Sequence, residues 1–312
     1  MNWLEITVET AANNIEDVAA CLTAGGFSDL VIEDQAEFED FLQENRSCWD
    51  YIDEDLQKQL EGLSRIKLYL EDTDTTGMEK LKTLVEKLGL AMVVSTMGET
   101  DWEESWKDNY PPQPVGKSLV VLPYWLADQD TDREKIILDP GLTFGTGAHP
   151  STQMVMQTME ETDLKDAACL DLGSGSGILS ITALRLGAKS AVGVDIDPKA
   201  EGIARENAAY NGFGAPEFVA LTGNVTADKK LMDRLAADRY DLVLVNIVAD
   251  VIIGLSQILP NFMDENTKLI CSGILDTRLE DVAAALQKAG LTITKIKAKE
   301  DWRCVSAKRR TL

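Results

Sequence analysis

The stretch ACLDLGSGSGILSITALRLGA, residues 168–188, decides the fold of this 312-residue chain. It begins with an apolar run typical of a buried strand, passes through Gly173, Gly175 and Gly177, and continues with apolar residues at helical spacing. Glycines in such a turn let the backbone approach a ligand, and the following helix directs its first N–H groups toward it. The pattern predicts a strand–turn–helix unit of an open α/β sheet that binds a nucleotide-type ligand.

The spacing of these glycines separates two classes of ligand. A dinucleotide fingerprint requires G-x-G-x-x-G, whereas this loop reads G-x-G-x-G and has Ile178 or Ser180 where the third dinucleotide glycine would stand. A nicotinamide-dependent dehydrogenase is therefore disfavoured. Further along, VGVDIDP places Asp195 at the end of the next predicted strand, where a carboxylate can accept both hydroxyls of a ribose. Asp197, before a proline, is better placed to cap the following helix.

A third polar residue ends another buried strand. The stretch YDLVLVNIVAD (240–250) predicts a strand that finishes at Asn246. Polar residues at the carboxyl ends of parallel strands form the sites of open α/β sheets, although an asparagine there can instead cap the next helix. Because the glycine loop and Asp195 already indicate a ligand nearby, we favour a role of Asn246 in the site.

A second glycine-rich stretch, DPGLTFGTGAHPST (139–152), contains His149, the only histidine of the chain. One interpretation makes His149 a general base. The other, which we favour, is that the imidazole holds the shape of the loop through hydrogen bonds. Pro150 is suited to begin the next helix, and Thr152 closes the stretch.

The first hundred residues predict a small α+β domain. Apolar–polar alternation indicates strands and 3.6-residue periodicity indicates helices in the order β-α-β-β-α-β, which is that of the split βαβ, ferredoxin-like module. We place this domain at residues 1–98, with an irregular or helical acidic insertion from Gln35 to about Gly62. The predicted strands are 3–9, 29–34, 65–71 and 91–97, and the helices are 15–27 and 78–89.

Residues 99–117 predict a helical linker. Trp102, Trp106 and Tyr110 fall on one face of a short helix that the following two prolines end. That helix either connects two domains or docks on its own domain, and the sequence favours neither. Residues 118–312 predict a doubly wound sheet with a terminal antiparallel strand pair. Its strands are predicted at 119–123, 135–139, 168–172, 190–195, 216–221, 240–246, 268–273, 291–299 and 302–307, with helices at 150–161, 177–186, 198–211, 229–237, 250–263 and 277–289.

Composition and charge narrow the functional classes. The formal net charge is −23 at pH 7, and residues 1–100 carry −15 of it. An acidic domain repels nucleic acid and attracts a basic partner, although a merely well-solvated surface explains the same charge. The five cysteines form no CxxC pair, and with one histidine this disfavours a metal site. No apolar run is long enough to span a bilayer, and the start lacks an export signal, so we expect a cytoplasmic location.

The motifs together resemble a known family. DLGSGSG, DIDP and NIVA are similar to three motifs of class I S-adenosylmethionine-dependent methyltransferases. Together with DWEESWKDNYPP, LDPGLTFGTGAHPST, SGIL and EDWRC they resemble, in order and spacing, the enzymes that methylate amino groups of the eleventh protein of the large ribosomal subunit. This resemblance extends from about residue 1 to residue 308.

The resemblance implies a Rossmann-like fold and S-adenosylmethionine as cofactor. It implies a basic ribosomal substrate, modified on lysine side chains and/or its N-terminal amine and recognised by the small N-terminal domain, and we expect a monomer without direct nucleic-acid contact. Asn224 lies where many methyltransferases place an aspartate that binds the adenine amine. The implied cofactor-binding residues are Thr152, Gly173, Gly175, Asp195 and Asn246.

Asn246 is also the implied catalytic residue. We expect its side-chain oxygen and the Ile247 carbonyl to accept hydrogen bonds from the substrate amine and so direct its lone pair toward the methyl group. The motif reads N-I-V-A instead of N-P-P-Y and lacks the aromatic residue, so Phe144 either covers the site or packs in the core. A methyltransferase for RNA or a small molecule would share every cofactor motif, whereas a non-catalytic descendant would have lost them.

Overall fold

The computed structural model of the protein describes residues 3–10, 14–27, 30–34, 64–97, 107, 110–140 and 147–310. The chain divides into two compact units, residues 1–109 and residues 110–312. The predicted acidic insertion lies outside the described residues, as do Trp102, Trp106 and most of the predicted linker helix.

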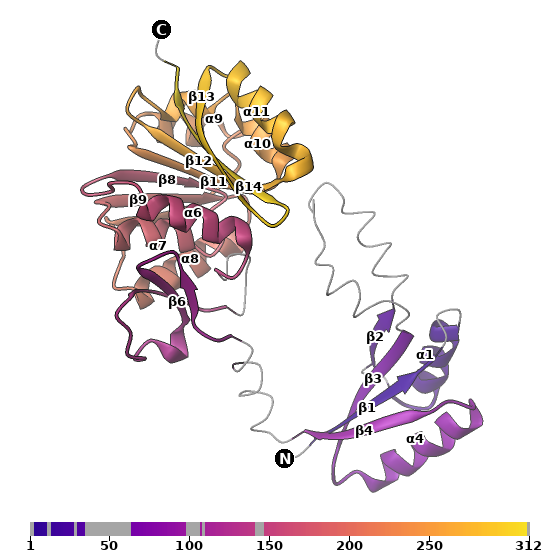
Figure 1. Ribbon diagram of the computed structural model, residues 1–312. Coiled ribbons are helices and arrows are strands. Elements are labelled where there is room, and N and C mark those ends of the chain that lie inside the picture. The colour runs from indigo at the N-terminus through magenta and orange to yellow at the C-terminus, as the bar shows by residue number, and fades with distance from the viewer. Residues whose placement is uncertain are drawn as a thin grey trace. The chain divides into compact units, whose positions relative to one another are not determined.

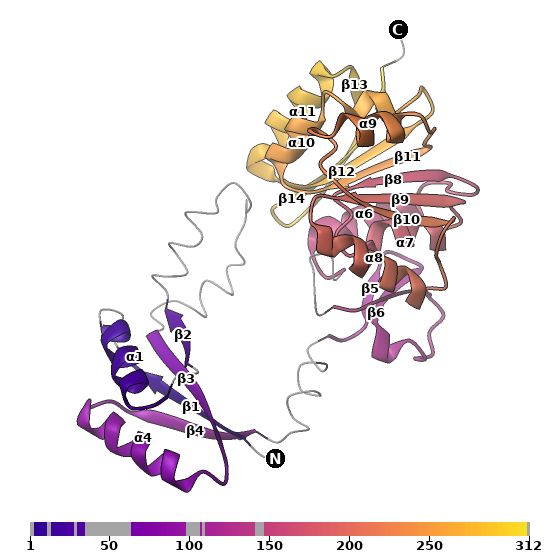
Figure 2. The same cartoon turned by 180° about the vertical axis from the view of Figure 1, so that it is seen from behind.

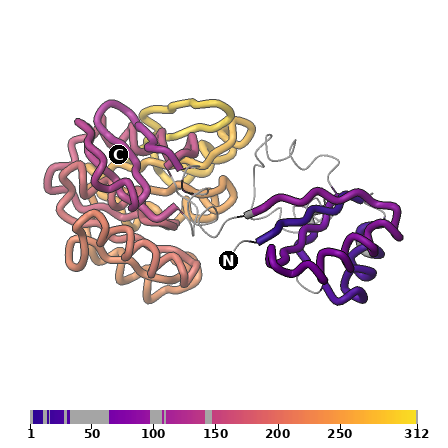
Figure 3. Tube along the Cα trace, turned by 90° about the horizontal axis from the view of Figure 1, so that it is seen from below, coloured from indigo at the N-terminus to yellow at the C-terminus, as the bar shows by residue number. Residues whose placement is uncertain are grey.

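The first unit is a four-stranded antiparallel sheet with two helices. Its strands are ordered β2-β3-β1-β4, which confirms the predicted ferredoxin-like arrangement. Apolar residues alternate along β1 and β3, so one face of the sheet packs against α1 and α4 in a shared core (Figures 1 and 3). The elements are β1 (Trp3–Glu9), α1 (Ile15–Ala24), β2 (Leu30–Asp34), β3 (Ser64–Glu71), α4 (Thr75–Lys87) and β4 (Met92–Met97).

The second unit contains a seven-stranded sheet between two layers of helices. The strand order is β10-β9-β8-β11-β12-β14-β13; the first five strands are parallel, and β14 is antiparallel to both of its neighbours. This confirms the doubly wound sheet with a terminal antiparallel pair. The strands are β8 (Ala168–Leu172), β9 (Ser190–Asp195), β10 (Phe218–Thr222), β11 (Leu242–Asn246), β12 (Lys268–Leu275), β13 (Leu291–Lys299) and β14 (Trp302–Arg309).

Helices cover both faces of this sheet. One layer holds α6 (Pro150–Glu160), α7 (Ile178–Arg185) and α8 (Pro198–Tyr210), and the other holds α9 (Lys229–Ala236), α10 (Ala249–Leu255) and α11 (Leu279–Lys288) (Figures 1 and 2). The chain leaves β8 toward β9 on one side and later returns to β11 on the other. The carboxyl ends of these strands therefore meet at a topological switch point, where open α/β sheets bind their ligands.

Two predictions from the sequence were wrong in detail. The strands β6 (Leu119–Pro123) and β7 (Glu134–Leu138) form a separate three-stranded sheet with β5 (Gln113–Val115) rather than extending the main sheet. The apolar pattern of a segment predicts a strand but not the sheet that the strand joins. The helix predicted over 250–263 ends at Leu255, and a 3-10 turn follows at Leu259–Phe262, because Pro260 has no N–H and restricts the residue before it.

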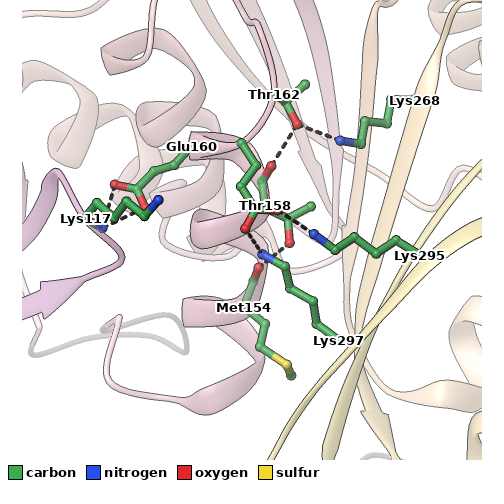
Figure 4. A network of polar contacts seen from close by, with 9 residues as sticks. Lys117, Met154, Thr158, Glu160, Thr162, Lys268, Lys295 and Lys297 are labelled. Atoms are coloured by element: carbon green, nitrogen blue, oxygen red, sulfur yellow. Dashed lines mark hydrogen bonds and ion pairs between the residues drawn. The ribbon is translucent and has the colours of Figure 1, made fainter.

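Two glutamates at the end of α6 fix that helix. The Glu160 carboxylate accepts hydrogen bonds from the backbone N–H groups of Lys117 (3.0 Å) and Ser118 (2.7 Å), in the turn between β5 and β6. Glu161 accepts from the ammonium groups of Lys295 (2.8 Å) and Lys297 (3.0 Å) on the edge strand β13. Figure 4 shows these two lysines beside the end of α6, where Glu160 also lies. These two hydrogen bonds lower the pKa of Glu161 to about 2. The helix that begins at Pro150 is therefore tied at its far end to two sheets.

We expect Glu161→Gln to lower the free energy of unfolding at pH 7 by about 0.5–1 kcal/mol, the range of exposed ion pairs. The pKa of Glu161 is lower in the folded than in the unfolded protein, so the difference between variant and wild type is constant above about pH 5. It shrinks as the pH falls from 4.5 toward 2. Urea unfolding across this pH range measures the difference in free energy of unfolding between variant and wild type. Glu217→Gln, at an exposed position, is the control. A difference that persists at pH 2 would contradict the ion-pair explanation.

Candidate functional site

The glycine loop between β8 and α7 requires its glycines. Gly173, Gly175 and Gly177 have φ angles of 78°, 49° and 79°, in the left-handed region that side chains disfavour by about 1–2 kcal/mol per residue. The Gly173 N–H donates to the carbonyl of Val194 at 2.8 Å, and the Gly177 N–H donates to that of Ser174 at 2.8 Å. The loop is thereby held against the end of the neighbouring strand β9.

Asp195 lies beside this loop. Its Oδ2 accepts the backbone N–H of Gly175 (2.8 Å), and its Oδ1 accepts that of Asp197 (2.9 Å). A carboxylate has about four acceptor positions, so the two oxygens retain capacity for the hydroxyls of a ribose. Asp197 accepts the backbone N–H of Lys199 at 2.9 Å, which confirms its predicted role as the cap of α8.

Asp171 is buried beneath the loop. Its Oδ2 accepts the N–H (3.1 Å) and the hydroxyl (2.8 Å) of Ser180, which fixes the first turn of α7. Burial raises the pKa of Asp171 to about 7, and the charge of Asp195 adds to the increase. The residue that opens the glycine motif is thus an internal support of the loop.

Asn246 and Thr152 meet although they are far apart in sequence. The Asn246 Nδ2 at the end of β11 donates to the Thr152 Oγ1 in the first turn of α6 at 3.1 Å. Within the described residues the buried Asn246 Oδ1 has no hydrogen-bond partner. The alternative role as a helix cap is wrong, because the residue that precedes α10 (Ala249–Leu255) is Val248 and not Asn246. Asn246 therefore offers a buried acceptor at the switch point.

His149 is the N-cap of α6. Its Nδ1 accepts the backbone N–H of Ser151 at 3.3 Å and lies 2.7 Å from the Ser151 hydroxyl. The imidazole ring also contacts the edge of Trp302, with the ring centres 4.6 Å apart. Both contacts support the structural role that the sequence favoured.

Two buried asparagines, Asn207 on α8 and Asn211 at its C-cap, were missed by sequence reasoning. The Asn207 Nδ2 donates to the carbonyl of Ser176 (2.9 Å), and its Oδ1 accepts the N–H of Asp139 (2.8 Å). Asn211 exchanges two hydrogen bonds with the backbone of Ile137. Helix α8 thus connects the end of β7 to the glycine loop. The available signal was a pair of asparagines four residues apart on the alanine-rich face of a helix.

Two other candidate residues remain outside the site as described. Asn224 is exposed, and its Oδ1 accepts the N–H (3.0 Å) and hydroxyl (2.6 Å) of Thr226, so this oxygen closes a local turn. Its suggested contact with adenine stays a prediction. Phe144 lies outside the described residues, so both interpretations of it stand.

The buried cysteines are structural. Burial raises the pKa of Cys169 to about 12 and that of Cys304 to about 11, and it also raises that of Cys271. These groups are thiols at neutral pH and hence poor nucleophiles. In the parts of the chain that the structure describes, no group of three histidine, cysteine or acidic residues could hold a metal ion, and no helix is long and apolar enough to cross a membrane.

Comparison with known proteins identifies the family. The model of the ribosomal protein L11 methyltransferase (PrmA) family matches residues 2–310. The chain belongs to the PrmA family. Curated PrmA relatives, each named ribosomal protein L11 methyltransferase, cover 99% of this chain: that of Alkaliphilus oremlandii is 34% identical over 99% of its own length, and that of Alkaliphilus metalliredigens 36% over 98%.

A solved structure gives the same family. The crystal structure of ribosomal protein L11 methylase from Lactobacillus delbrueckii subsp. bulgaricus matches with a TM-score of 0.58 and 32% sequence identity, covering 65% of this chain and 100% of that one. As a PrmA-family member, the protein is a methyltransferase that uses S-adenosylmethionine.

The residues present fit this PrmA cofactor. A side chain at Gly173 would overlap Ile247, so the loop can follow this path only with glycine at this position. We infer that Gly173 and Gly175 shape the loop, Asp195 holds the ribose, and Thr152 and Asn246 lie toward the methyl group. The assignment of the two glycines rests on their backbone geometry. The assignments of Asp195, Thr152 and Asn246 rest on side-chain oxygens that can accept further hydrogen bonds.

We expect His149→Asn to keep most of the methyltransferase activity, because asparagine caps a helix well. His149→Ala should lower the free energy of unfolding by about 1 kcal/mol through loss of the cap, while the folded variant still turns over. Turnover under saturating substrates and a urea unfolding curve measure the two effects. A folded, cofactor-binding but inactive His149→Asn variant would restore the catalytic histidine.

Proposed function

We propose that this protein transfers methyl groups from S-adenosylmethionine to amino groups of ribosomal protein L11, on lysine side chains and/or the N-terminal amine. The observation that carries the proposal is the Asn246 Oδ1, a buried acceptor without a partner among the described residues. An amine donates hydrogen bonds, so it fits an acceptor of this kind. The names of the PrmA relatives support L11 as the substrate.

The chemistry that remains for the protein is mainly orientation. The bound cofactor supplies a methyl group that its sulfonium already activates. Asn246 accepts an N–H of the neutral amine, and the bond from its Nδ2 to Thr152 sets the direction of the Oδ1. A substrate fixed in this way gains its rate from proximity and alignment rather than from a strong base. The Ile247 carbonyl packs against Gly273, so the proposal rests on Asn246 alone.

The same proposal assigns roles to the parts of the chain. Residues 1–98 recognise the substrate, residues 99–117 link the two domains, and residues 118–312 carry out the transfer. The last part of this linker, residues 110–117, folds with the second unit, where β5 pairs with β6. The charge of −15 on residues 1–100 supports this, since a basic ribosomal protein is attracted to an acidic surface. We further propose that the enzyme is a cytoplasmic monomer that does not contact nucleic acid directly.

Asn246→Ala should reduce the rate of methyl transfer by about 10²-fold or more, comparable to the loss of one oriented hydrogen-bonding group. S-adenosylhomocysteine, measured by calorimetry, should still bind. Asn261→Ala, an exposed asparagine elsewhere in the same unit, serves as the control. Unchanged turnover in Asn246→Ala would remove this residue from the mechanism.

The substrate is tested separately. The purified protein, radiolabelled S-adenosylmethionine and ribosomal proteins from a strain without this methylation should give label on L11, and mass mapping then locates the modified amines. Label on other proteins but not on L11 would overturn the substrate and leave the methyltransferase activity in place.

A further inference from the structure

We propose that Ile247 is the positioning residue that sets the distance between the cofactor loop and Asn246. The proposal rests on the proposed role of Asn246. It follows from two contacts in which a glycine makes room for Ile247, one with its side chain and one with its backbone.

The side chain of Ile247 packs directly on the first glycine of the cofactor loop. An ideal Cβ on Gly173 would overlap the Cγ2 methyl of Ile247. Gly173 has a φ of 78° and its N–H is bonded to Val194, so this glycine cannot turn away from the methyl group. The isoleucine therefore touches the loop at a position that is held in place.

The backbone of Ile247 packs on a second glycine. Gly273 has a φ of 80° and lies in β12 where the pairing with β14 shifts between Cys271 and Ile274. An ideal Cβ on Gly273 would lie 2.5 Å from the oxygen and 2.9 Å from the carbonyl carbon of Ile247. The Ile247 N–H also donates to the carbonyl of Ser272 at 3.2 Å. The peptide groups on both sides of Ile247 thus contact β12, one through a hydrogen bond and the other through packing.

These contacts turn Ile247 into a spacer. Its backbone is fixed to β12, its side chain meets the cofactor loop, and Asn246 directly precedes it. A β-branched side chain has few rotamers, so the spacer has a defined length. Because a misplacement of about 1 Å can reduce a rate by about 10²-fold, the length of this spacer affects methyl transfer even though Ile247 touches no reacting atom in our proposal.

Ile247→Ala separates positioning from ordinary packing. We expect kcat to fall by about 10- to 100-fold while the KM for S-adenosylmethionine changes little. Ile252→Val, in the fully buried core of the neighbouring helix α10, is the control and should leave kcat unchanged. If Ile247→Ala lowers thermal stability as any core truncation does but leaves kcat intact, the proposal is overturned.

A double-mutant cycle tests the contact itself. Gly173→Ala should weaken binding of S-adenosylhomocysteine, and this loss should be smaller in the Ile247→Ala background, where Cγ2 is absent. Gly177→Ala is the matched control: this glycine has a φ of 79°, but its Cβ would meet Ala204 instead. Its effect should be the same in both backgrounds.

The outcomes distinguish the two proposals. Because the cycle measures S-adenosylhomocysteine binding, it needs no protein substrate and remains decisive if L11 is not methylated. Additive effects of Gly173→Ala and Ile247→Ala overturn the spacer. Full turnover of Asn246→Ala overturns the assignment of that residue, whatever the cycle shows.

Discussion

The reversal of strand order at β8 is the constraint on which the site depends. Because β9 lies on one side of β8 and β11 on the other, the carboxyl ends of three parallel strands meet at one place. The glycine loop follows the first of these strands, Asp195 ends the second and Asn246 ends the third. None of these residues is reactive by itself. Their function comes from being held close together at the ends of neighbouring strands, because the sheet fixes their positions relative to one another.

Helix α6 completes this arrangement and is fixed at both ends. His149 caps its start and packs against Trp302. At its end, Glu160 bonds to the turn between β5 and β6, and Glu161 bonds to β13 of the main sheet. Between these attachments Thr152 meets Asn246. The acidic protein thus uses a few of its lysines on the edge strand β13 to hold a helix that contributes to the site. Such charges also protect an exposed strand edge from pairing with another chain.

Local signals in the sequence were sufficient for the parts of the site that follow strands. Glycine spacing, an acid after one strand and an asparagine after another are enough to place Gly173, Asp195 and Asn246 at one edge of the sheet. Contacts between distant segments left no such trace. The packing of Ile247 on Gly273 and the hydrogen bonds of Asn207 depend on which surfaces pack together. The periodicity of the sequence does not specify these surfaces. The separate sheet of β5, β6 and β7 was missed for the same reason.

The two hydrogen bonds of Asn207 also limit how this protein can change over evolutionary time. One amide group joins the glycine loop to the segment after β7, so neither can lengthen or shift without leaving a buried polar group unpaired. Insertions should therefore accumulate elsewhere, and substitutions at these two segments should occur together with changes in α8. A side chain that bonds to the backbone of two separate segments in this way limits the range of sequences that the site can tolerate.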